Sequence, residues 1–399
     1  MLAVGVDVSK GKSMVAALTG DGELVIRPKE FAHNESEMTA LIMRLQSYGA
    51  EIRIVLEATG HYHFALVKRF QLAGLFVSVV NPFLMKKYLD GSIRKGKTDK
   101  KDAIKIATYC LEKWHKLTPY EAQDKQYEEL RFLSRQYNQA VSTKVKGKVW
   151  LSQLLDQIMP GIKTVLKSNH RNPMRNVLYD FIEKYGHYEN ILTLGIEQFV
   201  AGYSAWAKEK GYRYATSKAE QIYLLAQNAI PSRAADSSGC LALMQCLLLL
   251  KQAEGACNAI LAQMQEIAIT LPEYGVVRAM SGVGDRLAPR LIAEIGDVRR
   301  FTSAKALNAY AGNDAPPYQS GQYEGTRRHI SKRGSKSLRK AGYEAMKALK
   351  TVKPVHDDAV YRFILQKEAE GKPKNVAKMA GLNKFLRIYY ARVSEVYGA

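Results

Sequence analysis

The sequence contains few cysteines and lacks any long apolar run. The four cysteines are Cys110, Cys240, Cys246 and Cys257. None has metal-ligand spacing, so we expect reduced core thiols in a cytoplasmic protein and neither a disulfide framework nor a zinc site. The longest apolar stretch, residues 241–250, is too short to span a bilayer. The first residues also lack the basic, apolar and cleavage regions of a signal peptide.

Acidic residues are scarce relative to basic ones. The chain has 38 Asp and Glu against 59 Lys and Arg, a formal net charge of +21. Apolar residues make up 47% and charged residues 24%, which is typical of a folded chain. With 399 residues, two or three domains are expected. The positive charge favours a nucleic acid or another anionic partner over a small neutral substrate.

Residues 1–118 have the pattern of an α/β domain. We expect strands at residues 2–8, 14–19, 23–28, 52–58 and 75–80, and helices beginning at Asn34 and spanning 61–73 and 98–114. The order is three meandering strands followed by two crossover units. Short connections and right-handed crossovers place the fourth strand beside the first.

The rest of the chain is predicted to be helical. Two long helices are expected at residues 122–158 and 237–271, which pack either as a coiled coil, antiparallel or between chains, or as an ordinary bundle. On the second helix, one apolar side is expected to hold Leu241, Met244, Leu248, Ala253, Cys257, Ile260 and Met264. We therefore expect a helical coiled-coil region at 119–271, with an insertion at about 161–235 that carries no motif, and a helical domain at 272–399.

Two C-terminal segments have features of phosphate binding. Residues 280–297 predict a helix-hairpin-helix-like element in which Gly282 and Gly284 present N–H groups to a phosphate, although a plain packed turn has the same pattern. A basic run follows between residues 327 and 350, and it is either a solvated face or a phosphate-contacting surface, which we favour. The candidate nucleic-acid-binding residues in it are Arg327, Arg328, Lys332, Arg333, Lys336 and Arg339.

Four carboxylates are predicted to converge in the first domain. Asp7 lies within the first strand and Glu57 ends the fourth, so the two meet at the carboxyl edge if these strands are neighbours. Asp99 and Asp102 are three residues apart at the start of a helix, and therefore share a face that can cover this edge. Four converging carboxylates repel one another unless cations neutralise them. Mg²⁺ prefers oxygen ligands, and two such ions can clamp both oxygens of a phosphodiester exchange.

Each acid also has a simpler explanation. An Asp after a strand is usually a turn residue, and an Asp pair that opens a helix is usually a cap. Asp7 is the hardest to explain in this way, because Asp is disfavoured in strands. The neighbouring Lys95, Lys97 and Lys100 are expected to hold a nucleic-acid backbone around the acids.

Several motifs together resemble a known family. The acids lie in GVDVSK (Asp7), LEATG (Glu57) and KTDKKDA (Asp99 and Asp102). The C-terminal part contains SGVG, EIGD-x-x-x-F, A-x-x-x-Y-A-G, P-x-x-x-SG and ISKRGSKSLRK. These motifs, within about residues 1–150 and 270–350, resemble the DEDD transposases of bacterial insertion sequences. The resemblance implies an RNase H-like (RuvC-like) N-terminal domain with the four acids as catalytic, metal-binding residues, and a C-terminal transposase domain.

The resemblance also implies a nucleophile and partners. Ser320 matches a family serine that attacks DNA, forms a covalent phosphoserine and acts with the acids across a domain-swapped dimer. The implied partners are donor and target DNA, further copies of the chain in a dimer or tetramer, and a structured non-coding guide RNA, the bridge RNA. From its residues alone, Ser320 would be a turn residue. The sequence departs from the family at Asn313-Asp314, where an apolar residue usually follows Ala-Gly.

Three alternatives remain open at the level of sequence. The first is a RuvC-like nuclease that hydrolyses branched DNA without a serine intermediate. The second is an ATPase of the actin and sugar-kinase type, although the chain lacks a convincing second phosphate-binding strand and turn. The third is a nucleic-acid-binding protein with no catalytic activity.

Overall fold

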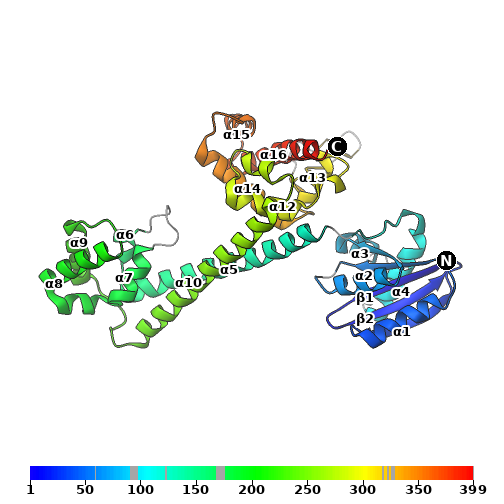
Figure 1. Ribbon diagram of the computed structural model, residues 1–399, viewed down its shortest axis with the longest axis horizontal. Coiled ribbons are helices and arrows are strands. Elements are labelled where there is room, and N and C mark those ends of the chain that lie inside the picture. Colours follow the sequence, from blue (N-terminus) through cyan, green and yellow to red (C-terminus); the bar gives the residue numbers. More distant parts are fainter. Residues whose placement is uncertain are drawn as a thin grey trace. The chain divides into compact units, whose positions relative to one another are not determined.

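The computed structural model describes residues 1–58, 60–89, 98–121, 124–167, 176–316, 319–320, 323–324 and 329–398. The chain forms two compact units, Met1–Ala122 and Gln123–Ala399 (Figure 1). The second unit contains both the long helices and the C-terminal helices. The finer division at residues 118 and 271 stays a prediction.

The first unit is built on a five-stranded mixed sheet. Its strands are β1 (Leu2–Val8), β2 (Lys12–Thr19), β3 (Leu24–Ala32), β4 (Ile52–Glu57) and β5 (Phe76–Val80). They lie in the order β3-β2-β1-β4-β5, with β1 antiparallel to β2 and parallel to β4. The predicted placement of the fourth strand beside the first is therefore confirmed.

Helices cover both faces of this sheet. They are α1 (Glu35–Gln46), α2 (His63–Leu72), α3 (Pro82–Leu89), α4 (Asp99–Glu112) and a short 3₁₀ turn at Trp114–Lys116. Because strand side chains alternate between faces, Val4 and Val6 of β1 pack with α1 and α2, whereas Ala3 packs with α3 and α4. The predicted stripe of α4 (Ala103, Ile106, Ala107 and Cys110) is buried as expected.

Helix α3 was not predicted from the sequence. It starts with Pro82 at its first position, after Asn81, whose side-chain Oδ1 accepts the Phe83 N–H at 2.8 Å. Asn followed by Pro is a recognised helix start, so the signal was present. Met85 is its fully buried side chain.

The second unit is organised along two long antiparallel helices, α5 (Lys125–Ile158) and α10 (Ser238–Ile269) (Figure 1). Gln126 of α5 donates to Thr270 just beyond the end of α10 at 2.9 Å, and Gly147 faces Leu250 further along. One end carries α6 (Ile162–Val165), α7 (Val177–Tyr185), α8 (Tyr188–Glu209) and α9 (Thr216–Asn228). These helices share an aromatic-rich core with the adjoining parts of α5 and α10. The antiparallel arrangement was one of the predicted options, and coiled-coil packing stays a prediction.

The other end of the helix pair carries the C-terminal elements. They are α11 (Tyr274–Ala279), α12 (Gly284–Ile295), a 3₁₀ turn (Val298–Arg300), α13 (Ala304–Ala311), β6 (Gln319–Ser320), β7 (Tyr323–Glu324), α14 (Lys336–Val352), α15 (Ala359–Ala369) and α16 (Lys374–Val396). These helices share one core with the start of α5 and the end of α10. The region from residue 272 onward is thus mainly helical, as predicted.

The predicted buried side of α10 is wrong in its first half. Leu241 and Leu248 are 65% and 50% exposed, whereas Leu243, Leu247 and Leu250 are buried. The segment is apolar at nearly every position, so its periodicity has too little contrast to identify a face. Further along, the expected burial of Ala253, Cys257 and Met264 is confirmed.

Two further expectations concern α10 and the thiols. By length and composition alone, α10 is the one described helix that would suffice to cross a membrane, a test that core helices of soluble proteins also pass.

All four cysteines are free. Cys110, Cys246 and Cys257 are buried, and burial raises the pKa of Cys110 to about 12. Cys240 is only partly buried and packs against the edge of the core at the α6–α9 end.

Gly5 in β1 lets α4 lie against the sheet at backbone distance. A Cβ at this position would lie 2.2 Å from the Ala107 nitrogen and 2.4 Å from the Ala103 oxygen, both in the α4 backbone. Backbone atoms cannot turn aside as a side chain can, so any larger residue must displace the helix. Gly5 therefore fixes the position of α4 over β1.

We expect Gly5→Ala to destabilise the first unit by about 1–3 kcal/mol, because the added methyl group forces α4 away from the sheet. Hydrogen exchange measured by mass spectrometry should become faster in peptides from β1 and α4. Gly20→Ala is the matched control, since its Cβ would approach only the flexible Met1 side chain, at 3.4 Å. Equal exchange in the two variants would contradict the prediction.

Candidate active site

Asp7 and Glu57 occupy neighbouring positions on the α4 face of the sheet. In the parallel pairing of β1 and β4, Val6 lies opposite Leu56, so Asp7 and Glu57 are the next residues in register. Asp7 follows Gly5 by two residues, and Gly5 faces α4. Glu57 likewise follows Val55, which packs with α4 side chains. The alternation of strand side chains therefore turns both carboxylates toward the same face at the carboxyl edge.

Asp99 and Asp102 lie in the first turn of α4. Thr98 caps this helix and accepts the Lys101 N–H at 3.3 Å, so neither Asp provides the N-cap. Asp102 is 8% exposed, one residue before Ala103, which meets Gly5. Asp99 is exposed. At Lys12 of β2 the pKa is raised mainly by the ion pair with Glu30, and the Asp99 charge adds to it. The start of α4 thus lies near the carboxyl end of β1.

The four acids carry the oxygen ligands that a divalent ion prefers, but their side chains are not gathered into a complete set of metal ligands. In the part of the chain that the structure describes, no three His, Cys, Asp or Glu side chains form a group that could hold a metal ion. Mg²⁺, however, usually takes only one or two protein carboxylates and fills its other positions with phosphate oxygens and water. The edge formed by Asp7 and Glu57 therefore suits an ion completed by a nucleic-acid phosphate.

The predicted basic residues around the acids are only partly described. Lys100 lies exposed in the first turn of α4. Lys95 and Lys97 lie outside the described residues, as do Arg327 and Arg328 in the C-terminal run.

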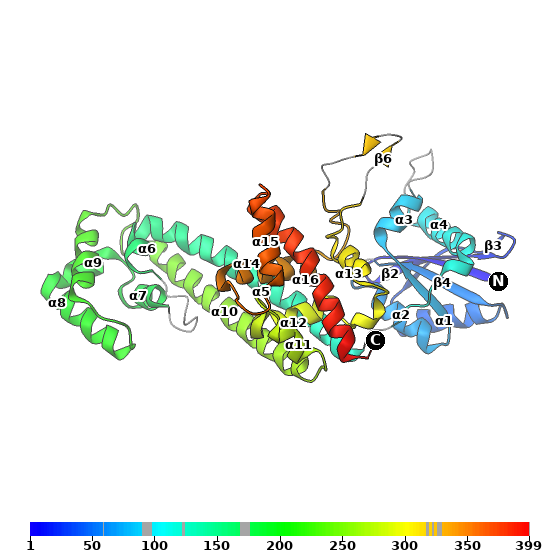
Figure 2. The ribbon, with the colours of Figure 1, turned by 90° about the horizontal axis from the view of Figure 1, so that it is seen from above.

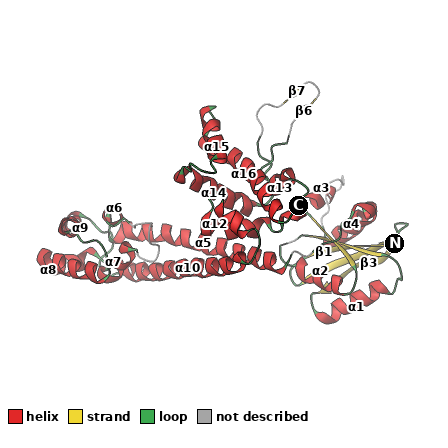
Figure 3. Cartoon of the chain, turned by 45° about the horizontal axis from the view of Figure 1, so that its top comes forward, coloured by secondary structure: helices red, strands yellow, loops and turns green. Residues whose placement is uncertain are grey.

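Ser320 ends the short strand β6. Its backbone pairs with Tyr323 of β7, and Gln319 pairs with Glu324. We call this pair of strands the serine hairpin. Figure 2 shows β6 away from the helices of the second unit, which Figure 3 colours red. The acids lie in the first unit and Ser320 in the second.

The C-terminal basic residues differ in what they contact. Lys332, Arg333 and Lys336 are exposed beside the start of α14. Arg339 instead donates through Nη1 to the carbonyls of Ala311 at 2.8 Å and Gly334 at 3.1 Å. Burial lowers the pKa of its guanidinium. Arg339 therefore braces the backbone, and the exposed residues are better placed to meet a phosphate.

A buried carboxylate holds the base of this basic segment. Glu294 of α12 is 1% exposed and accepts the Ser134 hydroxyl at 2.8 Å and Arg135 Nη2 at 3.0 Å, both from α5. Arg135 also donates to Ser337 at 2.8 Å, and Ser335, which caps α14, lies 3.5 Å from Glu294. Glu294 thus joins α5, α12 and the start of α14. The sequence carried one signal for this, a Glu in an otherwise apolar stretch.

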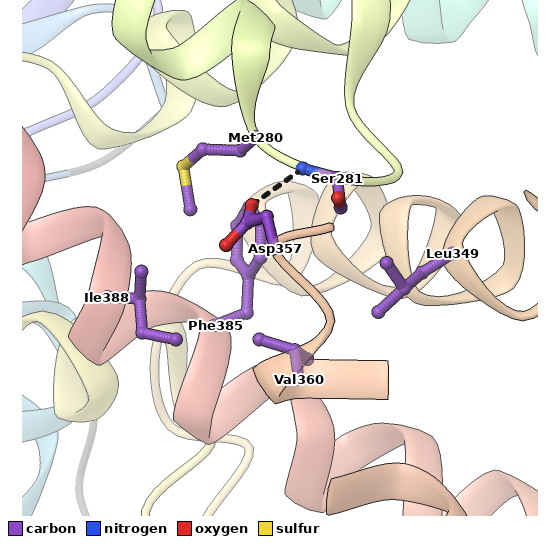
Figure 4. Close-up of a pocket in the computed structure, with 7 residues that line it drawn as sticks. All are labelled: Met280, Ser281, Leu349, Asp357, Val360, Phe385 and Ile388. Carbon is purple, nitrogen blue, oxygen red and sulfur yellow. Dashed lines mark hydrogen bonds between the residues drawn. The ribbon is translucent and has the colours of Figure 1, made fainter. Parts of the chain in front are cut away.

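The glycine turn proposed as a phosphate cradle has a packing role. A Cβ on Gly282 would lie 2.9 Å from the Ala345 oxygen, so glycine permits the close approach of α14. The Ser281 N–H is bonded to Asp357 at 3.1 Å (Figure 4). Arg392 pairs with the same carboxylate and lowers its pKa. The small crevice here is lined mainly by apolar side chains, and phosphate binding by this turn stays a prediction.

We expect Glu294→Ala to lower the free energy of unfolding of the second unit by about 1–3 kcal/mol, because the Ser134 hydroxyl and Arg135 lose their acceptor. Glu294→Gln should have a smaller effect, since it keeps an oxygen at the site. Urea unfolding followed by circular dichroism measures both changes. Glu129→Ala, at an exposed position on α5, should leave the midpoint unchanged, and a matching midpoint in Glu294→Ala would refute the role of Glu294.

Comparison with known proteins places the chain in a family. A family model for DEDD transposases, described as a transposase, matches residues 4–160, and a second, described as a transposase of the IS116/IS110/IS902 family, matches residues 274–361. A mini-circle transposase assigned to IS117 of Streptomyces coelicolor is 23% identical over 317 residues, 77% of this chain and 75% of that protein.

Other similarities are more local. The pilin gene-inverting proteins of Moraxella bovis and Moraxella lacunata are each 32% identical over 120 residues, 30% of this chain and 36% of theirs. A solved structure of T. thermophilus RuvC in complex with a Holliday junction substrate matches 30% of this chain and 99% of its own, with 13% identity and a TM-score of 0.24. The family matches lie on both segments whose motifs carry the candidate residues. The chain belongs to the IS116/IS110/IS902 family of transposases, enzymes that cut and rejoin DNA.

Proposed function

We propose that this transposase moves an insertion sequence by Mg²⁺-dependent transesterification with Ser320 as nucleophile, guided by a bridge RNA. The observation that carries the proposal is the placement of Asp7 and Glu57 side by side on one face of the sheet. Asp102 lies in the first turn of α4, the helix packed over that face. Three chain segments thus bring acids to one edge of an RNase H-like domain.

The proposed chemistry conserves phosphodiester bonds. The Ser320 Oγ attacks a DNA phosphorus and gives up its proton, the bond to the leaving strand oxygen breaks, and that oxygen takes up a proton while the phosphate stays bound to serine. A hydroxyl of the new strand then attacks the phosphoserine and releases Ser320. Bound at the acidic edge, Mg²⁺ supplies charge stabilisation for the attacking and leaving oxygens. A serine hydroxyl needs such activation.

The acids and Ser320 belong to different compact units of the chain. The acids belong to the proposed domain 1–118 and Ser320 to the proposed domain 272–399. Each active site must bring the two together, and we propose that it does so in a dimer, two of which can form a tetramer. The proposed helical region 119–271 connects the domains.

The basic charge supports the proposed partners. A net charge of +21 suits both donor and target DNA and a structured guide RNA. Base pairing by such an RNA supplies sequence choice without a base-reading module in the protein. We place this reaction in the bacterial cytoplasm, where the DNA lies.

Recombination in vitro tests the proposal directly. Purified protein, the RNA flanking its element, donor and target DNA and Mg²⁺ should give strand exchange and a covalent protein–DNA adduct. Ser320→Ala should lose both, and Asp7→Asn and Glu57→Gln should lower both by at least about 100-fold, because transition-state charge loses its stabilisation. Strand exchange by Ser320→Ala, or in EDTA, would refute the mechanism. DNA cleavage without an adduct would indicate a nuclease.

Salt dependence tests the basic segment. Each of Lys332→Ala and Lys336→Ala should reduce the slope of log Kobs against log salt concentration by about 0.7–0.9, the value for one lost phosphate contact. Binding measured by fluorescence anisotropy at several salt concentrations gives this slope. Lys210→Ala, at the exposed end of α8, should leave it unchanged. Equal slopes in all three variants would remove these lysines from the interface.

A further inference from the structure

The two chain segments that flank the serine hairpin in the sequence come together at a pair of glycines. Gly312 ends α13 with a φ of +63°, and Gly334 precedes the cap of α14. A Cβ on Gly334 would lie 2.1 Å from the Tyr310 oxygen and 2.4 Å from the Gly312 nitrogen. Only glycine allows the two backbones to approach this closely.

Hydrogen bonds continue the crossing toward the hairpin. Ser335 N–H donates to the Tyr310 carbonyl at 2.6 Å, and Lys332 N–H donates to the Gly312 carbonyl at 3.0 Å. Ser331 N–H donates to the Asp314 carbonyl at 2.8 Å. We call residues 310–314 together with 331–335 the stem.

A side-chain contact lies at the hairpin side of the stem. The Ser331 hydroxyl donates to Asp314 Oδ1 at 2.5 Å, and both residues are partly buried. At the other side, the stem is fixed to the helices by Arg339 and by the cap of α14 beside Glu294. A continuous set of contacts therefore runs from α5 and α12 to Asp314.

A small movement at the contact between Asp314 and Ser331 would displace Ser320. Ser320 follows Asp314 by six residues, a reach of at most about 20 Å. Over that reach, a tilt of about 10° at the stem would move Ser320 by at most about 3.5 Å, a distance comparable to the separation that reacting atoms require. A small change in the angle of the stem is thus enough to move the Ser320 hydroxyl out of reach of the DNA phosphorus.

We propose that Asp314 and Ser331 are positioning residues, which fix the direction of the serine hairpin relative to the helical body. This rests on the proposed function, in which Ser320 is the nucleophile. The Asp314 carboxylate holds the Ser331 hydroxyl, and the glycine crossing holds the two backbones. Neither residue takes part in bond making at the phosphate.

Two substitutions at Asp314 distinguish a positioning role from a role in folding. Asp314→Ala removes the acceptor for Ser331, whereas Asp314→Asn keeps an oxygen at the same place. We expect Asp314→Ala to slow formation of the Ser320–DNA adduct about 100-fold in single turnover, with the dissociation constant for DNA unchanged. Asp314→Asn should restore most of the rate. Asp236→Ala, at an exposed position in the same unit, is the control and should behave as the native protein.

Hydrogen exchange in the free protein gives a readout that needs no DNA. Asp314→Ala and Ser331→Ala should each speed exchange at the Lys332 and Ser335 amides. Their effects on adduct formation should not add in the double variant, because both remove the same contact.

Several results would overturn the proposal. One is unchanged hydrogen exchange at the stem amides in Asp314→Ala. Another is faster hydrogen exchange in that variant while the Ser320–DNA adduct forms at the native rate. An equal loss of DNA affinity would make Asp314 a binding residue. Strand exchange by Ser320→Ala would instead refute the proposed function, and it would appear in a variant whose stem is native.

Discussion

The contact between Gly5 and α4 determines where the acids lie. The sheet alone brings Asp7 and Glu57 together, because β1 and β4 are parallel neighbours. The third segment arrives only because β1 has no side chain at Gly5, so that the α4 backbone rests directly on the strand. Asp102 is one residue from that contact. A backbone contact has little freedom to adjust, and it therefore places a charged side chain more firmly than side-chain packing would.

The second unit uses the same device at a different place. Gly312 and Gly334 bring two backbones together below the serine hairpin, as Gly5 does below the acids. Asp7 lies two residues beyond Gly5 and Ser320 lies eight residues beyond Gly312, and a larger residue would disrupt either glycine contact. Each half of the candidate site thus has a close backbone contact at glycine nearby in the chain, although the two halves belong to separate compact units.

Much of the first unit could be predicted from the sequence because its signals are local. The compact apolar strands, the helix starts at Asn34 and Thr98 and the apolar stripe of α4 are all strong local signals. Strand order followed from the handedness of crossovers. The face of α10 could not be predicted, because a run of leucines and other apolar residues has no contrast.

Contacts between distant segments were beyond the reach of sequence patterns. The Glu294 cluster joins residues about 160 positions apart in the chain, and no periodicity reports such a pairing. Asn313-Asp314 stood out only as a departure from the family pattern. In the structure, Asp314 is the acceptor for Ser331, a contact that the departure alone did not indicate. The bonds from Arg339 to the Ala311 and Gly334 carbonyls were likewise not predicted, since a basic run does not show which of its members bond to carbonyls.

The antiparallel pair of α5 and α10 has a consequence for how the chain can diverge. A helix of 34 residues is about 50 Å long, and the module of α6 to α9 is inserted at the far end of the pair from the C-terminal core. Because the two helices pack along their own lengths, that module can grow, shrink or be exchanged while the helix pair stays in register. Natural variation in this segment is therefore expected to be tolerated far more readily than change at Gly5 or Gly334.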